Sequence, residues 1–296
     1  MTEQETSMTE NAHIETHANG NAGHPEDEEH GTGHGGHAFP APHPSHEQTQ
    51  AEDDLLTVRA VSGLSGDMML AGLASLAELT DKELQTLVGE LKISALEGSL
   101  SVEPRTVNHV SGTGCRVDLP HEHAHRNLAD ILKLITASSM PEPAKGLAAR
   151  AFTLLGEAEA AVHGTKAPDV TFHEVGALDS ILDICLVCRL FLLLRPARFV
   201  CSPLPLADGV ITCAHGRVPS PAPAVLRLLE GVPVRGFSGG GETVTPTALS
   251  LLKALDAEFG PWPAMTVRKT TISYGTRIFT DAPNGAVWAL GCPGRE

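Results

Sequence analysis

Apolar and polar positions follow two different periods along this chain, and the change between them marks the expected elements. Residues 55–61 are mostly apolar, which predicts a short buried strand. From Met68 to Leu79 the apolar positions recur at helical spacing, so a helix should follow the Gly-rich turn at 62–67. The same reasoning predicts further helices at 81–91, 127–136, 142–163, 179–194, 222–229 and 247–259, and strands at 98–104, 106–119, 200–206, 210–213, 232–234, 265–272 and 286–291.

Several element ends carry recognisable signals. Thr80 is the expected N-cap of the helix at 81–91, and Gly164 should end the helix at 142–163. The two strands between 98 and 119 should pair through a turn near Gly112 and Gly114. Strands and helices alternate without internal repeats, which predicts an α/β or α+β fold, a mixed sandwich of short strands and helices forming one domain over 55–296.

Residues 1–54 differ from the rest in composition. They hold twelve Asp or Glu, no Lys or Arg, and eight of the fifteen histidines, with almost no large apolar side chains. Such a segment cannot bury enough surface to offset its ordering entropy, so we expect a disordered, acidic, His-rich tail. Imidazole and carboxylate suit Ni, Zn or Cu, which makes the tail a candidate metal buffer or delivery arm. The alternative is a solvated low-complexity segment without metal.

Charge and hydropathy narrow the function classes. The net charge is −15, and outside residues 1–54 the chain is nearly balanced, with 24 acidic against 21 basic side chains. Nucleic acid is therefore an unexpected partner, because phosphate binding needs a cationic surface. The longest apolar run, 184–194, is too short for a bilayer and is broken by Arg189. The polar, acidic N-terminus and six cysteines predict a cytoplasmic protein with reduced thiols.

The densest polar motif outside the tail is 120–127, Pro-His-Glu-His-Ala-His-Arg-Asn. Its alternate imidazoles, His121, His123 and His125, would point one way from an extended segment and could hold a metal ion. The alternative is an exposed charged loop that precedes a helix.

A second polar group surrounds the start of the helix at 179–194. Asp179 and Asp183 stand four residues apart on one face of an otherwise apolar helix, just after His173 and Glu174. This mixed set of nitrogen and oxygen donors suits a divalent ion or proton transfer. The alternative is that Asp179 caps the helix while Asp183 faces water.

The cysteines give weaker signals. Cys185 and Cys188 form a CxxC inside an apolar helix, where buried thiols acting as small hydrophobic groups are the better interpretation. Cys213 and His215 stand beside a turn that Pro219 and Pro221 should stiffen, and this pair could bind a soft metal or act in catalysis.

Two Gly-rich loops are candidates for binding an anion. The turn after the first strand contains Ser62, Gly63, Ser65, Gly66 and Asp67, and it leads into a helix whose free N–H groups suit phosphate or carboxylate. A plain tight turn is an equally good interpretation. The loop at 239–247 also runs into a helix, and it offers the hydroxyls of Thr243, Thr245 and Thr247; an ordinary capped helix is the alternative.

Six stretches of this sequence, taken in their order along the chain, resemble the nickel-insertion proteins that mature the nickel-pincer nucleotide cofactor of lactate racemase. The similarity covers roughly residues 56–290. The order of the matching stretches identifies the family more specifically than any one stretch does. The matching stretches are 62–68, 121–131, 172–184, 201–206, 213–226 and 242–247.

The resemblance implies an enzyme, a nickel chelatase or cyclometallase of the lyase class, that inserts Ni(II) into a pyridinium-3,5-bisthiocarboxylic acid mononucleotide. The metal becomes bound to two thiocarboxylate sulfurs and a ring carbon, with CTP consumed in the presence of Mg or Mn. Loss of the ring proton requires a base. From residue chemistry we expect nickel or the proton acceptor among His121, His123, His125, His173, Glu174, Asp179 and Asp183. His215 is a further candidate metal ligand, and Asp67 is a further candidate catalytic residue. The two Gly-rich loops should then hold the anionic substrate.

Two departures from the family pattern bear on these expectations. Members usually carry an acidic residue at the position of Arg59, so no role is transferred there. Full-length members continue into a C-terminal portion associated with nucleotide binding, whereas this chain stops at Glu296. CTP use is therefore expected to need a companion chain, and a homo-oligomer is left open.

Two other functions compete with nickel insertion. A non-catalytic nickel chaperone or store would use the tail and 121–125, and it would leave CTP intact. A metal-dependent hydrolase would turn over a phosphoester without incorporating nickel.

Overall fold

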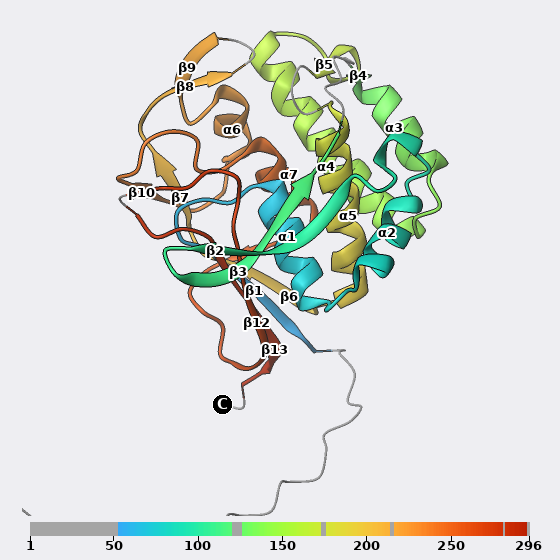
Figure 1. The fold of residues 1–296 in the computed structure, drawn as a ribbon. Coiled ribbons are helices and arrows are strands. Elements are labelled where there is room, and N and C mark those ends of the chain that lie inside the picture. The colour runs from blue at the N-terminus through green and yellow to red at the C-terminus, as the bar shows by residue number, and fades with distance from the viewer. Residues whose placement is uncertain (1–52, 120–125, 173–175, 214–215, 281, 295–296) are drawn as a thin grey trace, which may run out of the picture. The chain divides into compact units, whose positions relative to one another are not determined.

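A seven-stranded mixed sheet forms the base of the fold, with the strand order β11-β6-β1-β13-β12-β3-β2 (Figure 1). The computed structural model describes residues 53–119, 126–172, 176–213, 216–280 and 282–294. The strands of this sheet are β1 (Leu55–Ala60), β2 (Leu100–Val107), β3 (Val110–Val117), β6 (Arg198–Cys201), β11 (Glu258–Phe259), β12 (Met265–Ser273) and β13 (Ala286–Pro293).

The central strand β1 pairs with both halves of the sheet. It runs parallel to β6 and antiparallel to β13, so Val58 is the register partner of both Cys201 and Trp288. All the core-facing positions of β1 are buried, as its apolar sequence predicts. The mixture of parallel and antiparallel pairs, combined with helices, confirms the predicted mixed α/β class. Residues 1–52 of the predicted tail lie outside the described residues, whereas Asp54, predicted to belong to the tail, is buried, pairs with Arg268 and is part of the fold.

The helices pack on the sheet in successive layers that begin with α1. Helix α1 lies against β3, β12 and β13, and α5 and α7 pack on α1; α4 then packs on α5 and α7 and contacts α3 and α6 (Figure 1). The helices are α1 (Gly66–Leu76), α2 (Asp81–Gly89), α3 (Leu128–Ala137), α4 (Glu142–His163), α5 (Leu178–Leu194), α6 (Pro223–Leu228) and α7 (Pro246–Ala254), with short 3₁₀ turns at Ser94–Leu96 and Ala167–Asp169.

Three two-stranded ladders lie outside the main sheet. Strands β4 (Arg126–Asn127) and β5 (Thr171–Phe172) pair antiparallel, as do β8 (Gly209–Cys213) and β9 (Gly216–Ser220). The third pair, β7 (Leu204–Ala207) and β10 (Val234–Phe237), is parallel.

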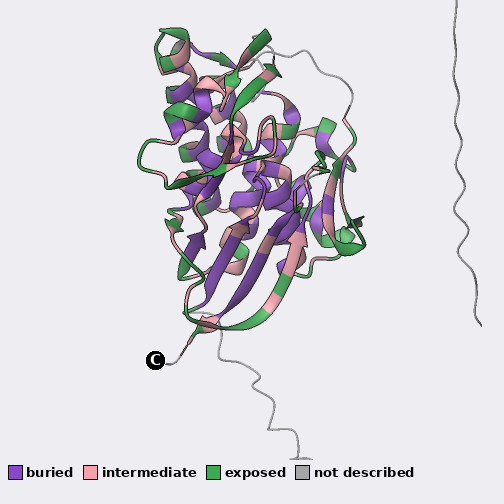
Figure 2. Ribbon diagram, turned by 90° about the vertical axis from the view of Figure 1, so that its left-hand side faces the viewer, coloured by how far each residue is buried: buried purple, intermediate pink, exposed green. Residues whose placement is uncertain are grey.

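The contact between α1 and the sheet centres on Trp288. This indole is fully buried, donates from Nε1 to Ser273 Oγ at 2.8 Å, and stacks on Phe199 with ring centroids 6.4 Å apart. A Cβ at Gly72 would lie only 2.4 Å from Trp288 Nε1, so the helix can approach the sheet this closely only because Gly72 has no side chain. Figure 2 shows the buried positions running along these strands and the helices behind them.

The predicted hairpin between 98 and 119 forms, but its turn lies elsewhere. Asn108 and His109 make the turn, with φ values of 49° and 62°. Gly112 and Gly114 lie inside β3, where a Cβ at Gly112 would come within 2.4 Å of Ile272 O on β12. Gly112 therefore allows β3 and β12, which are far apart in sequence, to approach each other closely. A glycine in this role has the same local sequence signal as a glycine in a turn.

The chain around Pro219 and Pro221 was expected to form a stiffened turn, but residues 216–220 form the strand β9. Pro219 on β9 pairs with Val210 on β8, in a ladder that joins no other strand in the described chain. Proline is tolerated there because the outer edge of each strand in a two-stranded ribbon pairs with no further strand, so no backbone N–H is needed on that side. Residues 214–215, between these strands, lie outside the described ranges.

Other element ends agree with the sequence. Thr80 caps α2 in a full capping box with Glu83, and Gly164 ends α4 with φ of 64°. Helix α7 ends at Ala254, before the predicted 259, because Asp256 adopts φ of 51° and the chain enters β11.

Two arginines occupy strongly apolar elements, and both have structural partners. Arg189 interrupts the apolar run of α5 and forms a two-point ion pair with Glu90, with Nε–Oε2 at 2.8 Å. Arg59 on β1 donates to Gly260 O at 2.9 Å and lies over the Trp262 ring at 5.5 Å. Arg59 thus ties the chain that follows β11 to the sheet, which gives this position a structural role.

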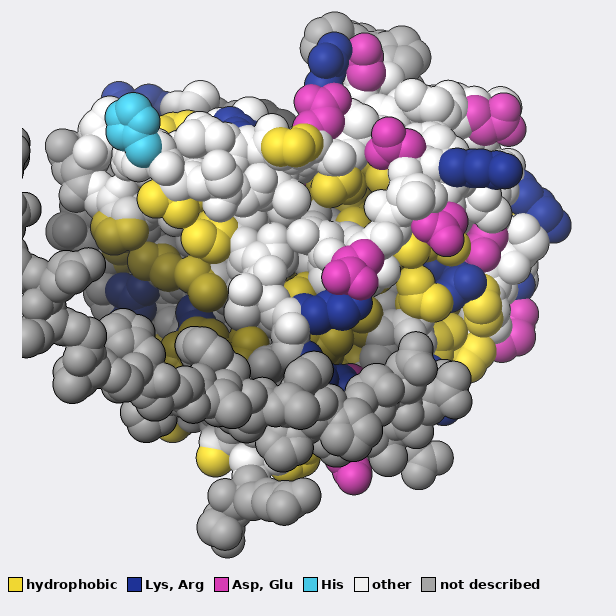
Figure 3. Space-filling model, turned by 60° about the horizontal axis from the view of Figure 1, so that its bottom comes forward, with side chains coloured by type: hydrophobic (Ala, Val, Ile, Leu, Met, Phe, Trp, Pro, Cys, Tyr) yellow, Lys and Arg dark blue, Asp and Glu magenta, His cyan; other side chains and the backbone are white. Residues whose placement is uncertain are grey.

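Acidic and basic side chains are interspersed on the face that Figure 3 shows. In the described chain, some exposed ion pairs join residues far apart in sequence, including Arg198 with Glu258 at 2.6 Å and Arg150 with Asp256 at 2.7 Å. These exposed pairs contribute little individually, typically about 0–1 kcal/mol. Within the described residues, no helix is both long and apolar enough to cross a membrane.

The contact at Gly72 can be tested with a pair of helix glycines. We expect Gly72→Ala to lower the free energy of unfolding by about 1–3 kcal/mol, because the new methyl overlaps Trp288. Gly146 on α4 has open space around it, so Gly146→Ala should instead raise stability by up to about 1 kcal/mol. Chemical denaturation of both variants measures the difference; equal effects would contradict the packing described here.

Candidate functional site

The two Gly-rich loops predicted to hold an anion lie against each other. Leu64 N donates to Thr243 O at 2.8 Å, and Thr245 N donates to Leu64 O at 3.1 Å. A Cβ at Gly63 would lie 2.1 Å from Thr243 O, so the glycine is required for this contact. The structure therefore brings the loop after β1 and the loop before α7 together, as the shared-site prediction requires.

Most of the hydroxyls in these loops already make internal hydrogen bonds. Ser62 Oγ donates to Pro283 O, Ser65 Oγ to Asp67 Oδ1, Thr243 Oγ1 to Pro205 O at 2.7 Å, and Thr245 Oγ1 accepts from Ala248 N at 3.2 Å as the N-cap of α7. Through these hydrogen bonds, the four hydroxyl groups stabilise the arrangement of the two loops. A role in binding substrate stays a prediction.

Three elements meet at the first residue of α1. A Cβ at Gly66 would lie 2.7 Å from Asp183 Oδ2 on α5 and 2.8 Å from Thr247 Cγ2 on α7. Asp67, the next residue of α1, is close enough to Asp183 to influence its ionisation. The predicted site residues Asp67, Asp183 and Thr247 are therefore gathered at one place.

The Asp183 carboxyl is held in an unfavourable environment. Its Oδ1 atom is buried and has no hydrogen-bond partner among the described residues. Burial raises the pKa of this carboxyl well above its usual range, and the negative charges of Asp67 and Asp179 raise it further. The alternative in which Asp183 simply faces water is wrong, because its Oδ1 atom is buried and its Oδ2 atom lies against Gly66 of α1.

Asp179 occupies a different position on the same helix. Its side chain is exposed, and Oδ1 accepts from the backbone N of Ser180 at 2.6 Å. The helix itself begins after Ala177, whose side chain makes no cap bond. Asp179 therefore acts on Asp183 through its charge.

Cys115 on β3 also belongs to this group, and sequence analysis missed it. Burial raises the pKa of its thiol far above normal, and Asp183 and Asp67 raise it further through their charges. The thiol is therefore neutral at physiological pH and lies near both carboxylates. No local pattern reveals Cys115, because β3 and α5 are brought together only by the sheet.

The predicted metal donors lie outside the described residues, but the chain on either side of them is described. These donors are His121, His123, His125, His173, Glu174 and His215. Arg126 on β4 and Phe172 on β5 are register partners, and Arg126 Nη1 donates to Gly176 O at 3.0 Å. The segments 120–125 and 173–175 are therefore attached at neighbouring points of one ladder. Elsewhere in the described chain, no group of three or more His, Cys, Asp or Glu is arranged to hold a metal ion.

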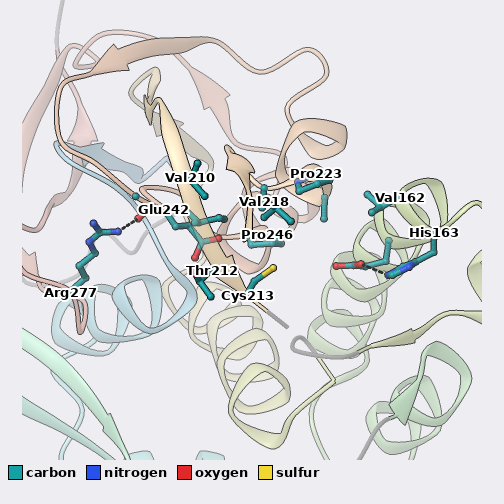
Figure 4. A pocket seen from close by; sticks show the side chains of 15 residues that line it. Val162, His163, Val210, Thr212, Cys213, Val218, Pro223, Glu242, Pro246 and Arg277 are labelled. Atoms are coloured by element: carbon teal, nitrogen blue, oxygen red, sulfur yellow. Dashed lines mark hydrogen bonds and ion pairs between the residues drawn. The ribbon is translucent and has the colours of Figure 1, made fainter. Parts of the chain in front are cut away.

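A cavity of about 700 Å³ opens beside these loops, between the C-terminal end of α4, the β8–β9 ladder and the start of α7 (Figure 4). Its walls are largely apolar, with Val162, Val218 and Pro246 among them. Its polar side chains are Glu159, His163, Thr212, Cys213, Glu242 and Arg277. Figure 4 shows Glu242 on the same side as Thr212 and Cys213, with His163 opposite and paired with Glu159 at 3.4 Å.

The sequence matches one family over most of its length. The nickel insertion protein family matches residues 56–290. The chain belongs to this nickel-insertion family.

Curated relatives within the family support the assignment. A putative nickel insertion protein of Myxococcus xanthus is 42% identical over 241 residues, covering 80% of this chain and 60% of the relative. One from Geotalea daltonii is 40% identical over 223 residues, covering 75% of this chain and 57% of the relative. The pyridinium-3,5-bisthiocarboxylic acid mononucleotide nickel insertion protein of Staphylococcus epidermidis is 34% identical over 223 residues, covering 75% and 55%.

This member of the nickel-insertion family therefore spans a little over half the length of the curated relatives it matches. No solved structure matches the chain.

Other thiols of this family member have a simpler explanation. Cys185 and Cys188 on α5 are fully buried, and burial raises the pKa of both, that of Cys185 to about 12. These thiols are small core groups, which confirms the interpretation of the CxxC as packing.

The burial of Asp183 predicts a pH-dependent stability. The folded chain holds this proton more tightly than the unfolded chain, so the stability that the group contributes falls as the pH rises above its ordinary value of 3.8. Asp183→Asn has no charge to bury. We expect its thermal midpoint to exceed that of the wild type by about 3 °C or more at pH 8, with a smaller difference near pH 4, since 1 kcal/mol corresponds to about 2–4 °C at this chain size.

The control is Asp118→Asn, whose side chain is 82% exposed and whose midpoint should change little at either pH. A wild type more stable than Asp183→Asn at pH 8 would show that the carboxylate is stabilised in the fold, against the environment described above.

Proposed function

We propose that this chain inserts Ni(II) into pyridinium-3,5-bisthiocarboxylic acid mononucleotide, in the class of nickel chelatases or cyclometallases. The observation that carries the proposal is the family match over residues 56–290, together with the name of the Staphylococcus epidermidis relative. In this reaction nickel is a substrate, and it becomes bound to two thiocarboxylate sulfurs and one ring carbon.

Formation of the nickel–carbon bond breaks a ring C–H bond, and its proton needs an acceptor. We assign that acceptor to Asp183, since a carboxylate with a raised pKa is a stronger base than an ordinary one. Its Oδ1 atom is buried and has no hydrogen-bond partner among the described residues. Asp67 maintains the high pKa through its charge and is held by Ser65. The proton moves from the ring carbon to the Asp183 carboxylate while nickel takes the carbon electron pair.

We place the nickel donors among His121, His123, His125, His173 and Glu174, with His215 as a further candidate. Imidazole nitrogen and carboxylate oxygen suit Ni(II). The β4–β5 ladder supports this placement because it fixes the described ends of both donor-bearing segments beside each other. The helix α5, which begins two residues after Gly176, carries Asp183.

We further propose that the reaction consumes CTP with Mg or Mn, and that this step needs sequence corresponding to the remainder of the longer relatives. This chain matches 57% of the Geotalea daltonii protein, so the relatives contain a further portion to supply it. That portion would act as a companion when it is provided as a separate polypeptide.

A second candidate is a non-catalytic nickel chaperone. It is favoured by the eight histidines within the first 50 residues, which combine imidazole with many carboxylates. The two functions differ in whether CTP and the pyridinium mononucleotide are consumed.

The test is a reconstitution with the full chain. The pyridinium mononucleotide, NiCl₂, MnCl₂ and CTP are incubated with it, with and without the C-terminal portion of a longer relative. We expect mass spectrometry to show a product that has gained nickel and lost the ring proton, together with CMP and pyrophosphate. Nickel binding with intact CTP and unchanged mononucleotide in both mixtures would favour the chaperone.

The proton acceptor is tested in the same assay. Asp183→Asn should lower the rate of product formation by about 10²–10⁴-fold, the usual contribution of a positioned base. Asp118→Asn, at an exposed position directly after β3, should keep the wild-type rate. An Asp183→Asn protein that forms product normally would remove Asp183 from the reaction.

A further inference from the structure

The cavity of about 700 Å³ contains a pair of donor side chains that has no part in the proposed reaction. Glu159 and His163 are separated by four positions on α4, so their side chains lie on the same face of the helix. This face lines the cavity, and Figure 4 shows His163 across the cavity from Cys213 on β8. An imidazole and a carboxylate one helical turn apart are a common way to present two ligands to one metal ion.

The spacing of the two donor atoms fits a shared metal ion. His163 Nε2 and Glu159 Oε2 are 3.4 Å apart. A charge-assisted hydrogen bond between such groups is shorter, at about 2.7–2.9 Å. Two atoms that bind one first-row metal ion, each at about 2.0–2.2 Å, stand about 3.0–3.4 Å from each other. The pair can therefore take a divalent ion between its donor atoms without any movement of the helix.

The end of α4 also attracts a cation electrostatically. The helix ends at His163, and Gly164 follows in the left-handed conformation with φ of 64°. The last carbonyl groups of a helix carry partial negative charge, which favours a cation beside the last turn. The Glu159 carboxylate adds a full negative charge, and its side chain is only 14% exposed. Because water screens charges less in such a place, the attraction is stronger than on an open surface.

The basic side chain of the cavity lies away from this pair. Arg277 is the only Lys or Arg among the described residues that line the cavity, and Figure 4 shows it on the far side from His163. Its Nη2 donates to Gly240 O at 2.5 Å, and its guanidinium lies over the Phe279 ring at 5.0 Å. These contacts hold the positive charge at the opposite edge, so it does not compete with a cation at the α4 wall.

The two donor types select among divalent ions. Imidazole nitrogen together with carboxylate oxygen suits Ni(II) and its neighbours in the first row, whereas Mg²⁺ prefers oxygen ligands and water. Within the described ranges, no three or more His, Cys, Asp or Glu are arranged to hold a metal ion. A site with two protein donors leaves the other positions of the ion to water, which suits an ion that must later move on.

We propose that Glu159 and His163 form an entry site for Ni(II), where the hydrated ion binds before it reaches the insertion site. The delivery role rests on the proposed function, whereas the binding of a divalent ion does not. The opposite wall leads toward a proposed nickel donor, because β8 ends at Cys213 and His215 follows two positions later in the sequence. An ion released from α4 therefore crosses the cavity toward a segment that carries a further ligand.

The site is tested by methyl NMR spectroscopy of the full chain, labelled in its valine methyl groups and titrated with NiCl₂. Val162 precedes His163 and lines the cavity, so a paramagnetic ion at the pair should broaden its methyl signals. We expect His163→Ala and Glu159→Gln each to raise the nickel concentration needed by at least about 10-fold, because even the loss of a group that supports a ligand costs about 10–100-fold in affinity. Excess MgCl₂ should leave the broadening unchanged.

The matched control is Glu157→Gln, an exposed position on the same helix outside the cavity lining, which should respond to nickel as the wild type does. Thermal midpoints measured without nickel confirm that each variant is folded. The double variant should lose little more than either single variant, because both residues hold one ion. Broadening that both single variants retain, broadening that MgCl₂ abolishes, or a wild type that shows none at millimolar NiCl₂ overturns the proposal.

The entry site and the reaction can fail separately. In the reconstitution at limiting NiCl₂, His163→Ala and Glu159→Gln should form product more slowly than the wild type, and excess NiCl₂ should restore their rates. Wild-type rates for both variants at limiting NiCl₂ would reject the entry role while leaving nickel insertion in place. The expected methyl response, without metallated product in any mixture, would support the nickel site and reject nickel insertion as the function.

Discussion

The close approach of α1 to its neighbours is the constraint on which the fold and the candidate site both depend. At Gly72 the helix backbone touches Trp288 of the sheet, and at Gly66 it touches Asp183 and Thr247. Two turns of one helix thus set the distance to the sheet and to the α5–α7 layer. Because interiors are close-packed, a helix displaced by one methyl group would move Asp67 away from Asp183 as well as disturb the core.

The buried carboxyl of Asp183 costs stability, and the surrounding residues do little to reduce that cost. Asp67 and Asp179 add negative charge, and the nearby Cys115 thiol stays neutral. Groups held against their own electrostatic preference are typical of functional sites. The Glu90–Arg189 pair shows the contrasting arrangement, since there a half-buried charge on α5 is matched by a two-point partner.

Local signals predicted much of the fold, and long-range contacts limited the rest. The N-cap at Thr80, the helix end at Gly164 and the buried strand that begins at Leu55 depend on neighbouring residues and were predicted correctly. Gly112 was taken for a turn residue because a strand–strand contact with β12 leaves no local trace. Within the candidate site, sequence pattern found Asp183 but missed Cys115 and Arg277, which elements distant in sequence bring to their places.

The β4–β5 ladder has a consequence for metal capture. It is only two residues long on each side, yet it joins segments that are 45 positions apart in sequence, Arg126 to Thr171, and Arg126 adds a bond to Gly176. If the proposed nickel donors lie on the chain attached at both sides of this ladder, they would meet a shared ion at high effective concentration, on the order of millimolar for short connections. The second side would then bind in an intramolecular step, and a bound ion would strengthen a ladder that is too short to be stable alone.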